Sequence, residues 1–270
     1  MEEDKIAQAF AQEEIYEWGS CAYAQLEPHL LSCRNGSRIP PHAHTVLCAL
    51  FPYRVPVGEH NISRYAIPPD YHHIVLPMLQ RVVSRLERAF PGYAFAAFSD
   101  NSPIPEVRAA SLSGLGCVGD HGLLIHPVYG SWVFIGEIVT DLPISVPFRE
   151  TAGCLHCGAC ARRCPGQALQ TGNLEQSRCL SHITQKKGQL SPEEQGLLLR
   201  GELAWGCDLC QEVCPMNKNA KPMGMRVFQE GCIPVIAPGQ AASLSGRAFQ
   251  WRPAAVIERN LEWMGKKENP

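Results

Sequence analysis

The sequence predicts a mixed α/β (α+β) domain followed by a smaller, cysteine-rich domain. Apolar segments of helix and strand character alternate in the first half, and eight of the thirteen cysteines crowd residues 154–214. Hydrophobic residues make up 45% of the 270 residues, which is enough for a substantial core. We place the α/β domain at residues 1–146 and the cysteine-rich domain at 147–234, and we expect 235–270 to form a helical or extended appendage.

The first half begins with a predicted helix and a strand–helix–strand unit. Apolar residues recur at helical spacing over residues 3–18, and Gly19 closes that pattern. Residues 45–53 and 93–100 are short, apolar and aromatic-rich segments bounded by Pro or Gly, which is typical of strands. They flank a helical pattern over 71–89, so this region predicts a layered α/β arrangement.

Two further apolar segments predict a hairpin at the end of the first domain. Residues 122–127 (GLLIHP) and 131–141 (SWVFIGEIVTD) are separated by residues 128–130. A three-residue connection is short enough for two antiparallel strands to pair.

The charge balance and the N-terminus limit the partner classes. With 24 Lys and Arg against 26 Asp and Glu, the formal charge of −2 gives no global signal of a nucleic-acid or anionic-membrane partner. The sequence starts MEEDKIAQAF, which is acidic where a secretory signal is basic and apolar, and no apolar run reaches the roughly 18 residues that span a bilayer. We therefore expect a cytoplasmic protein without a membrane partner.

The cysteine spacing predicts two iron–sulfur clusters. Residues 154–165 read CLHCGACARRCP, which is the C-x2-C-x2-C-x3-C-P spacing of two-cluster ferredoxins, where the fourth cysteine ligates the other cluster. Residues 206–215, GCDLCQEVCP, repeat the later part of that motif without its leading cysteine. Cys179 is the natural replacement, displaced upstream by an insertion of helical character at 191–203.

These eight cysteines divide into two crossed sets, each of which would hold one 4Fe-4S cluster. The first set is Cys154, Cys157, Cys160 and Cys214, and the second is Cys164, Cys179, Cys207 and Cys210. Structural zinc or buried free thiols are the alternatives, but zinc ribbons lack this crossed spacing and free thiols do not recur at fixed spacing. We expect the remaining cysteines to be buried, unreactive thiols: Cys21, Cys33, Cys48, Cys117 and Cys232.

Two segments of the first domain, 99–110 and 114–141, are candidate site loops. Asp100 follows a predicted strand and precedes an Asn-Ser-Pro turn, a position where open α/β sheets present catalytic groups. It is equally explained as a turn or helix-capping aspartate. Residues 114–119, GLGCVG, run into an apolar strand instead of a helix, so a dinucleotide-binding loop is not favoured.

Glycines and histidines of the second loop have two interpretations each. His121 and His126 could bind a metal or transfer protons, but isolated histidines in apolar surroundings are more often structural. The glycines allow either close approach of a large ligand or a tight turn. They are Gly114, Gly116, Gly119 and Gly122.

Across nearly all of its length the chain resembles the epoxyqueuosine reductase family, cobalamin-dependent iron–sulfur enzymes related in fold to corrinoid reductive dehalogenases. The segments that carry the resemblance are SDNSPIPE, GLGCVGDHGLLI, YGSWVFIGEIVTDLP, CLHCGACARRCPGQAL, SRCLSH and GCDLCQEVCPMN. The resemblance implies a corrinoid-binding domain related to the nitroreductase fold, followed by a ferredoxin-like domain whose nearer cluster reduces base-off cobalamin.

The resemblance also implies site residues and partners. The family's catalytic acid falls on Asp100, which would donate a proton to the epoxide oxygen lost as water, and the apolar strand before it would raise its pKa. An external electron donor of low potential, of flavodoxin or ferredoxin type, would reduce the clusters, and tRNA would be the substrate. We expect the cobalamin to contact Gly114, Gly116, Gly119, Gly122 and Ser131.

Several departures from the family pattern bear on the substrate. Val107 follows Glu106 where the family commonly has Arg, and residues 117–120 read CVGD where it commonly has Trp-Ile-Gly-Lys, so Asp120 replaces a cation. Binding of tRNA depends on Lys and Arg contacts to phosphates. We also expect a short form without the helical-repeat domain of longer members. Reduction of another small molecule, as in dehalogenation, and electron transfer without catalysis are the alternative functions.

Overall fold

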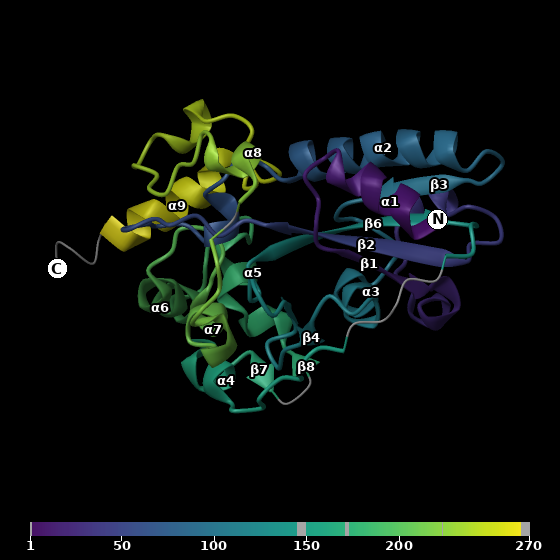
Figure 1. Ribbon diagram of the computed structural model, residues 1–270. Coiled ribbons are helices and arrows are strands. Elements are labelled where there is room, and N and C mark those ends of the chain that lie inside the picture. The colour runs from purple at the N-terminus through teal and green to yellow at the C-terminus, as the bar shows by residue number, and fades with distance from the viewer. Residues whose placement is uncertain (1, 145–149, 171–172, 223, 266–270) are drawn as a thin grey trace. The chain divides into compact units, whose positions relative to one another are not determined.

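The structure is a computed structural model, and the chain in it divides into two compact units (Figure 1). The residues it describes are 2–144, 150–170, 173–222 and 224–265. Unit 1 comprises Met1–Pro52, Tyr71–Val118 and Leu123–Cys154, and unit 2 comprises Tyr53–Asp70, Gly119–Gly122 and Leu155–Pro270. Both units are discontinuous in sequence, whereas the boundaries 1–146, 147–234 and 235–270 are contiguous. Those boundaries stay a prediction.

Unit 1 is built on one four-stranded sheet in the order β1-β2-β6-β3. Its strands are β1 (Trp18–Ala22), β2 (Thr45–Pro52), β3 (Phe95–Phe98) and β6 (Val133–Thr140). β6 is antiparallel to both β2 and β3, and its central residue Glu137 lies opposite Cys48 on one side and Phe98 on the other. The strands predicted over 45–53 and 93–100 are therefore confirmed.

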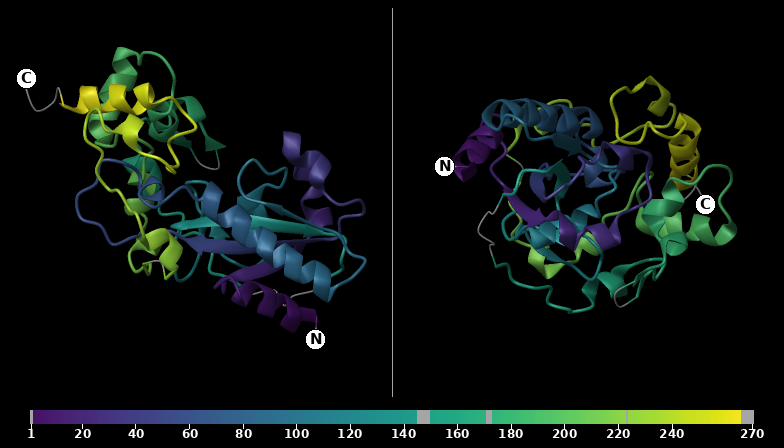
Figure 2. Two further views of the ribbon diagram at one scale, coloured as in Figure 1. Left: turned by 90° about the horizontal axis from the view of Figure 1, so that it is seen from above. Right: turned by 90° about the vertical axis from the view of Figure 1, so that its right-hand side faces the viewer.

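Helices cover both faces of this sheet (Figures 1 and 2). α1 (Glu2–Ala11) and α2 (His72–Ala89) lie on one face, and α3 (Glu106–Leu112) packs on β1, β2 and β6 from the other. A Cβ added at Gly136 would lie 2.6 Å from Leu79 of α2, so only glycine lets this helix approach β6 so closely. The predicted helix over 71–89 is confirmed.

The first helix is shorter than the periodicity of residues 3–18 predicted. α1 ends at Ala11, Glu14 has a left-handed backbone (φ +58°), and Trp18 begins β1. Trp18 lies at helical spacing from the apolar residues of α1 but belongs to the sheet. Its backbone pairs with Ala49 of β2, and its ring stacks on Phe10 at 5.2 Å between centroids.

The predicted hairpin between 122–127 and 131–141 is wrong. β5 (Leu124–Ile125) pairs with β4 (Cys117–Val118), whereas β6 enters the centre of the main sheet. Among the described residues, the bridge between His126 and Gly130 is what remains of the expected hairpin.

Short 3₁₀ helices complete unit 1. They are η1 (Tyr23–Gln25), η2 (Glu27–His29) and η3 (Arg34–Arg38).

Unit 2 consists mainly of short helices joined by loops. Its helices are α4 (Ala159–Arg163), α5 (Leu180–Thr184), α6 (Pro192–Gly201), α7 (Leu209–Glu212), α8 (Arg226–Gln229) and α9 (Ala254–Gly265). A two-stranded sheet pairs β7 (Leu169–Gln170) with β8 (Asn173–Leu174). The 3₁₀ helices are η4 (Arg64–Ala66), η5 (Gln176–Arg178), η6 (Pro215–Asn217) and η7 (Ala241–Ser243). The predicted helical insertion at 191–203 is α6, which begins with a reciprocal capping box between Ser191 and Glu194.

The C-terminal segment is part of the core of unit 2. Val256 and Ile257 of α9 are buried together with Trp205 and with Ile62. The side-chain amide of the fully buried Asn260 donates to the carbonyls of Thr184 (2.8 Å) and Ala204 (2.7 Å). No helix among the described residues is long and apolar enough to cross a membrane.

Candidate functional site

Asp100 lies in a backbone conformation that few residues adopt. It comes two residues after the end of β3, and both Asp100 (φ +53°) and Asn101 (φ +43°) are left-handed. The carbonyl of Asn101 accepts a hydrogen bond of 2.9 Å from the side-chain amide of Asn35, which anchors the turn. Two consecutive left-handed residues other than glycine cost of order 1–3 kcal/mol each, and such strain is concentrated at functional sites.

His72 fixes the Asp100 side chain. The carboxylate of Asp100 accepts a hydrogen bond of 2.9 Å from Nε2 of His72, the first residue of α2. The His72 ring stacks on Tyr71 at 4.0 Å, and Tyr71 stacks on Phe134 of β6 at 4.1 Å. The imidazole is therefore held by the sheet and directed at the carboxylate.

This hydrogen bond gives Asp100 a different acidity from the one predicted. The His72 hydrogen bond lowers the pKa of Asp100, and this effect outweighs the opposing effect of partial burial. The Asp100 side chain is 58% exposed because it lies beyond the apolar strand. The expectation that β3 would raise its pKa is therefore wrong.

Glu106, the first residue of α3, has the opposite perturbation. Burial raises its pKa from 4.5 to about 7, and the negative charge of Asp100 contributes to the rise. Near neutral pH this carboxyl is therefore divided between its protonated and ionised forms. The Asp100 turn thus carries one ionised carboxylate, one imidazole and one carboxyl that readily gives up or takes a proton.

Glu137 is a buried carboxyl that the sequence interpretation missed. It is 0% exposed in the middle of β6, and the Ser102 side chain is the polar group that partly offsets its burial. Burial raises its pKa well above the ordinary value, and the charge of Glu106 adds to the rise. The available signal was an acidic residue inside the otherwise apolar strand VFIGEIVT.

The glycines of 114–122 have several different roles. Gly114 (φ +71°) and Gly122 (φ +81°) have left-handed backbones, and a Cβ at Gly116 would lie 2.4 Å from the carbonyl oxygen of Ile125. The chain itself therefore requires glycine at 114 and 116. A Cβ at Gly122 would meet no atom within 4 Å, so its backbone borders open space. Ser131 is 3% exposed.

His126 is structural, as predicted. Its Nδ1 accepts hydrogen bonds from the backbone amides of Val128 (3.2 Å) and Tyr129 (3.3 Å), and its Nε2 lies 3.4 Å from a carboxylate oxygen of Glu17. Both ring nitrogens thus stabilise the turn before β6. His121 is also buried, and burial lowers its pKa.

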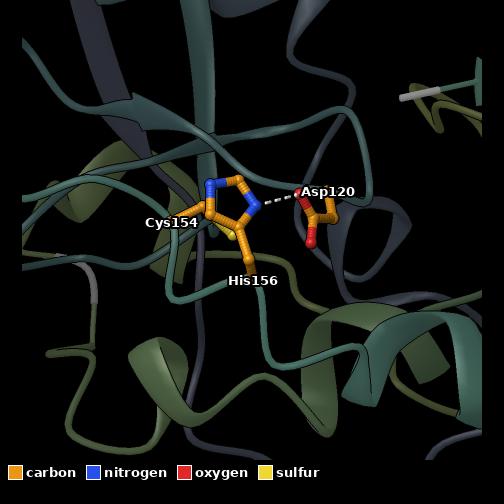
Figure 3. A group of neighbouring side chains, drawn as sticks. All are labelled: Asp120, Cys154 and His156. Atoms are coloured by element: carbon orange, nitrogen blue, oxygen red, sulfur yellow. Dashed lines mark hydrogen bonds and ion pairs between the residues drawn. The ribbon is translucent and has the colours of Figure 1, made fainter. Parts of the chain in front are cut away.

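Asp120 contacts the loop of the first cysteine motif (Figure 3). Its carboxylate accepts a hydrogen bond of 2.8 Å from Nδ1 of His156, which lies between the motif cysteines Cys154 and Cys157 and is 75% exposed. This acidic residue therefore orients a side chain of the loop. The sequence interpretation had not singled out His156.

The second cysteine set is brought together in unit 2. Burial raises the pKa of Cys207 to about 12, and the negative charges of Asp208, Cys179 and Cys164 contribute to the rise. Burial likewise raises the pKa of Cys210, with the same three neighbours and Cys207 adding to the effect. Each of these thiols makes it harder for its neighbours to ionise. A bound cation would therefore be needed to hold them as thiolates, and the irons of a cluster would supply that positive charge.

Local contacts around the motifs fit the same ligand chemistry. The backbone amide of Ala168 donates a hydrogen bond of 3.2 Å to the sulfur of Cys164, and such bonds tune the potentials of cluster sulfurs. α4, which contains Cys160, packs against α7, the helix that precedes Cys214. The division of the eight cysteines into two crossed sets stays a prediction.

The five other cysteines differ from one another in burial. Cys21 and Cys48 are buried, as expected, and burial raises the pKa of Cys48 well above its ordinary value. Cys33, Cys117 and Cys232 are only partly buried, which differs from the expectation that they are buried thiols. They lie in loops or on a two-residue strand, where few neighbours are available to cover them.

Comparison with known families and proteins assigns both regions of the chain. Residues 153–217 match a 4Fe-4S double cluster binding domain, which confirms the predicted two-cluster domain, and residues 35–101 match the family described as Epoxyqueuosine reductase QueG, DUF1730. The epoxyqueuosine reductase of Aliivibrio fischeri is 37% identical over 161 residues, which are 59% of this chain and 43% of that protein. That of Gloeobacter violaceus is 31% identical over 240 residues, which are 84% of this chain and 75% of that protein.

Solved structures share the fold. Epoxyqueuosine reductase from Streptococcus thermophilus superposes with a TM-score of 0.82 at 21% identity, covering 97% of this chain and 80% of that one. Epoxyqueuosine reductase with an epoxyqueuosine-modified tRNA stem loop gives 0.81 at 20% identity, with the same coverage. A reductive dehalogenase whose structure suggests a mechanism for B12-dependent dehalogenation gives 0.51 at 19% identity, covering 96% of this chain and 37% of that one.

The predicted fold class, a corrinoid-type α/β domain with a ferredoxin-like domain, is thus confirmed. The chain spans about half the length of several of the curated relatives it matches, from 43% to 56%, but three quarters of the Gloeobacter protein. On this evidence the chain belongs to the epoxyqueuosine reductase family.

Proposed function

We propose that this chain is an oxidoreductase that converts epoxyqueuosine in tRNA to queuosine. The observation that carries the proposal is the turn at Asp100, whose strained backbone and hydrogen bond to His72 hold a proton-transfer group beside Glu106. The same chain carries the two-cluster domain that supplies electrons. Loss of the epoxide oxygen as water consumes two electrons and two protons, so both parts are needed.

The clusters are assigned to the cysteines by their spacing and proximity. We assign one 4Fe-4S cluster to Cys154, Cys157, Cys160 and Cys214, and the other to Cys164, Cys179, Cys207 and Cys210. The mutual effect of Cys164, Cys179, Cys207 and Cys210 on thiol ionisation supports the second set. An external low-potential donor of flavodoxin or ferredoxin type would reduce them.

Cobalamin is the proposed cofactor, and it would receive its electrons from the clusters. The fold that the chain shares with a B12-dependent dehalogenase supports this, as does the open space beside the Gly122 backbone, which a side chain would fill. When bound, cobalamin supplies the low-potential electron chemistry that opens the epoxide. The residues that would hold it are Gly114, Gly116, Gly119, Gly122 and Ser131.

The protons come from the residues around Asp100. Asp100, which is ionised at rest, receives a proton from the adjacent His72 through their 2.9 Å hydrogen bond and passes it to the leaving oxygen. Glu106 stores a further proton, because its pKa of about 7 lets it gain and lose one near neutral pH. A positioned acid of this kind contributes about 10²- to 10⁴-fold to the rate.

We propose that the reaction takes place in the cytoplasm, with tRNA as the substrate. The solved complex of a family member with an epoxyqueuosine-modified tRNA stem loop supports this substrate. Because Asp120 replaces the family lysine and is bonded to His156, contacts to tRNA phosphates must come from other cations of the chain.

The test is single-turnover reduction by anaerobically prepared protein loaded with cobalamin. The substrates are an epoxyqueuosine-containing tRNA stem loop and, in parallel, a panel of small epoxides and organohalides. We expect conversion of the stem loop, loss of at least about 10²-fold in rate for Asp100→Asn, and no effect of the exposed control Glu87→Gln. Activity on organohalides alone would indicate a dehalogenase. Activity on none of the substrates would indicate an electron carrier. Full activity of Asp100→Asn would remove this residue from the mechanism.

A further inference from the structure

Asp208 is a buried carboxylate inside the second cysteine motif. It lies directly after Cys207 and two residues before Cys210, and it is 1% exposed. Its carboxylate accepts hydrogen bonds from the Ser63 hydroxyl (2.6 Å), the Arg64 backbone amide (2.6 Å) and the Gln211 side-chain amide (3.2 Å). All three are uncharged donors. Burial raises the pKa of Asp208, whereas the hydrogen bonds from Ser63 and Arg64 and the charge of the Arg64 side chain favour its ionised form.

The donors come from a segment far away in sequence that is fixed against the motif. Ser63 donates its backbone amide to the carbonyl of Trp205 at 2.7 Å, and Ile62 forms a bridge with Trp205. Gly206 has a left-handed backbone, and a Cβ there would lie 2.4 Å from the Cβ of Ser63. The segment therefore packs directly on the residue before Cys207 and holds Asp208 in place.

The two cysteine motifs differ at this position. Residues 154–157 read C-L-H-C and residues 207–210 read C-D-L-C, so Leu155 occupies the place that corresponds to Asp208. Leu155 is 62% exposed, whereas Asp208 is buried. The first motif has a carboxylate nearby, that of Asp120 beside Cys154, but this carboxylate is partly exposed and bonded to His156, whereas Asp208 is buried within the second motif itself.

We propose that Asp208 is a positioning residue that lowers the reduction potential of the cluster bound by Cys164, Cys179, Cys207 and Cys210 below that of the other cluster. This inference rests on the proposed ligand sets. A fixed negative charge in a dry interior disfavours the addition of an electron to a nearby cluster, because the interaction there is weakly screened. Its proximity follows from its place directly after Cys207 and two residues before Cys210, and from its hydrogen bond with the side chain of Gln211, the residue after Cys210.

The experiment is an anaerobic potentiometric titration with dithionite, monitored by electron paramagnetic resonance, on the full chain and its variants. Iron and sulfide are measured first, so that a failure of the ligand assignment is distinguished from a failure of this inference. Cys179→Ser identifies which signal belongs to the second set. For Asp208→Asn we expect the equilibrium constant of one-electron reduction to rise at least tenfold for that cluster alone, which corresponds to about 59 mV.

Two further variants separate charge from shape. Ser63→Ala removes a hydrogen bond to Asp208 but leaves the negative charge of Asp208. The reduction potential of the second cluster should therefore stay unchanged or fall. Glu212→Gln removes a charge at the end of α7, where the side chain is 39% exposed. We expect it to change the reduction potential less than Asp208→Asn does. An unchanged potential in Asp208→Asn, or an equal rise in Ser63→Ala, would overturn the proposal. If Asp208→Asn does not assemble clusters, the two potentials of the wild type still test the proposal. Cys179→Ser identifies the signal of the second cluster, and the proposal fails if that signal has the higher reduction potential of the two.

Discussion

Replacing Glu106 by Gln should make the protein more stable at neutral and alkaline pH. The pKa of this carboxyl is about 7 in the folded protein and 4.5 in the unfolded chain. Between these values the folded state holds a proton that the unfolded state has lost, so the stability contributed by Glu106 is full below about pH 4.5 and is lost as the pH rises to about 7. Gln mimics the protonated form and avoids this loss.

The magnitude follows from the difference between the two pKa values. A difference of about 2.5 units at 1.36 kcal/mol per unit gives about 3 kcal/mol. This is an upper limit, because part of the rise comes from repulsion by Asp100, which relaxes when the neighbouring side chains move.

The assay is urea unfolding of the wild type and Glu106→Gln under anaerobic conditions at half-unit steps from pH 4 to pH 8. We expect the difference in unfolding free energy between the two proteins to change by up to about 3 kcal/mol in favour of Gln between pH 4.5 and pH 7, and then to level off. Glu87→Gln, an exposed position on α2, should give a difference that is nearly independent of pH. A flat difference for Glu106→Gln, or one of opposite sign, would refute the perturbed ionisation of this residue.

Three further predictions concern the clusters, the core and the proton donor. The wild type should bind about eight irons and eight sulfides, and Cys179→Ser should lose about half of the iron; loss of all of it, loss of none, or zinc in place of iron would contradict the crossed ligand sets. Asn260→Ala should destabilise the protein by about 2–4 kcal/mol in urea unfolding, because it leaves two buried carbonyls without donors, whereas Asn219→Ala at an exposed position should be close to neutral. His72→Ala removes both the proton that is relayed to Asp100 and the hydrogen bond that lowers its pKa, so the single-turnover rate should fall at neutral pH and recover in part at lower pH, where Asp100 is itself protonated; an unchanged pH profile would show that His72 does not act on this carboxylate.

The sequence predicted the elements whose pattern is local. β2 is buried at every position and apolar at all of them except Thr45, and α2 has a regular apolar stripe, so both were predicted within one or two residues. The iron–sulfur domain follows from cysteine spacing, which is fixed by the geometry of the clusters. Asp100 was identified by its place after a strand and by the family resemblance.

What the sequence could not predict depends on contacts between distant residues. The order of strands in the sheet places β6 between β2 and β3, and no local pattern distinguishes this from a hairpin with β5. The acidity of Asp100 is set by His72, 28 positions away in sequence, and that of Glu106 by burial that only the assembled fold provides. The pairing of Ile62 with Trp205 has no signal in either segment alone.

That pairing has a consequence for how the protein is made. Ile62 and Trp205 are 143 positions apart, since 205 minus 62 is 143, and the same buried cluster includes Ile257 from α9. During synthesis the core of unit 2 therefore stays incomplete until α9 has left the ribosome, and by then the cysteines of both motifs have already been synthesised. Contacts this distant in sequence form slowly. Chaperones and cluster-assembly factors would thus meet an open, thiol-rich chain, and a fragment that begins after residue 70 would lack the strand partner of Trp205 and stay in that vulnerable state.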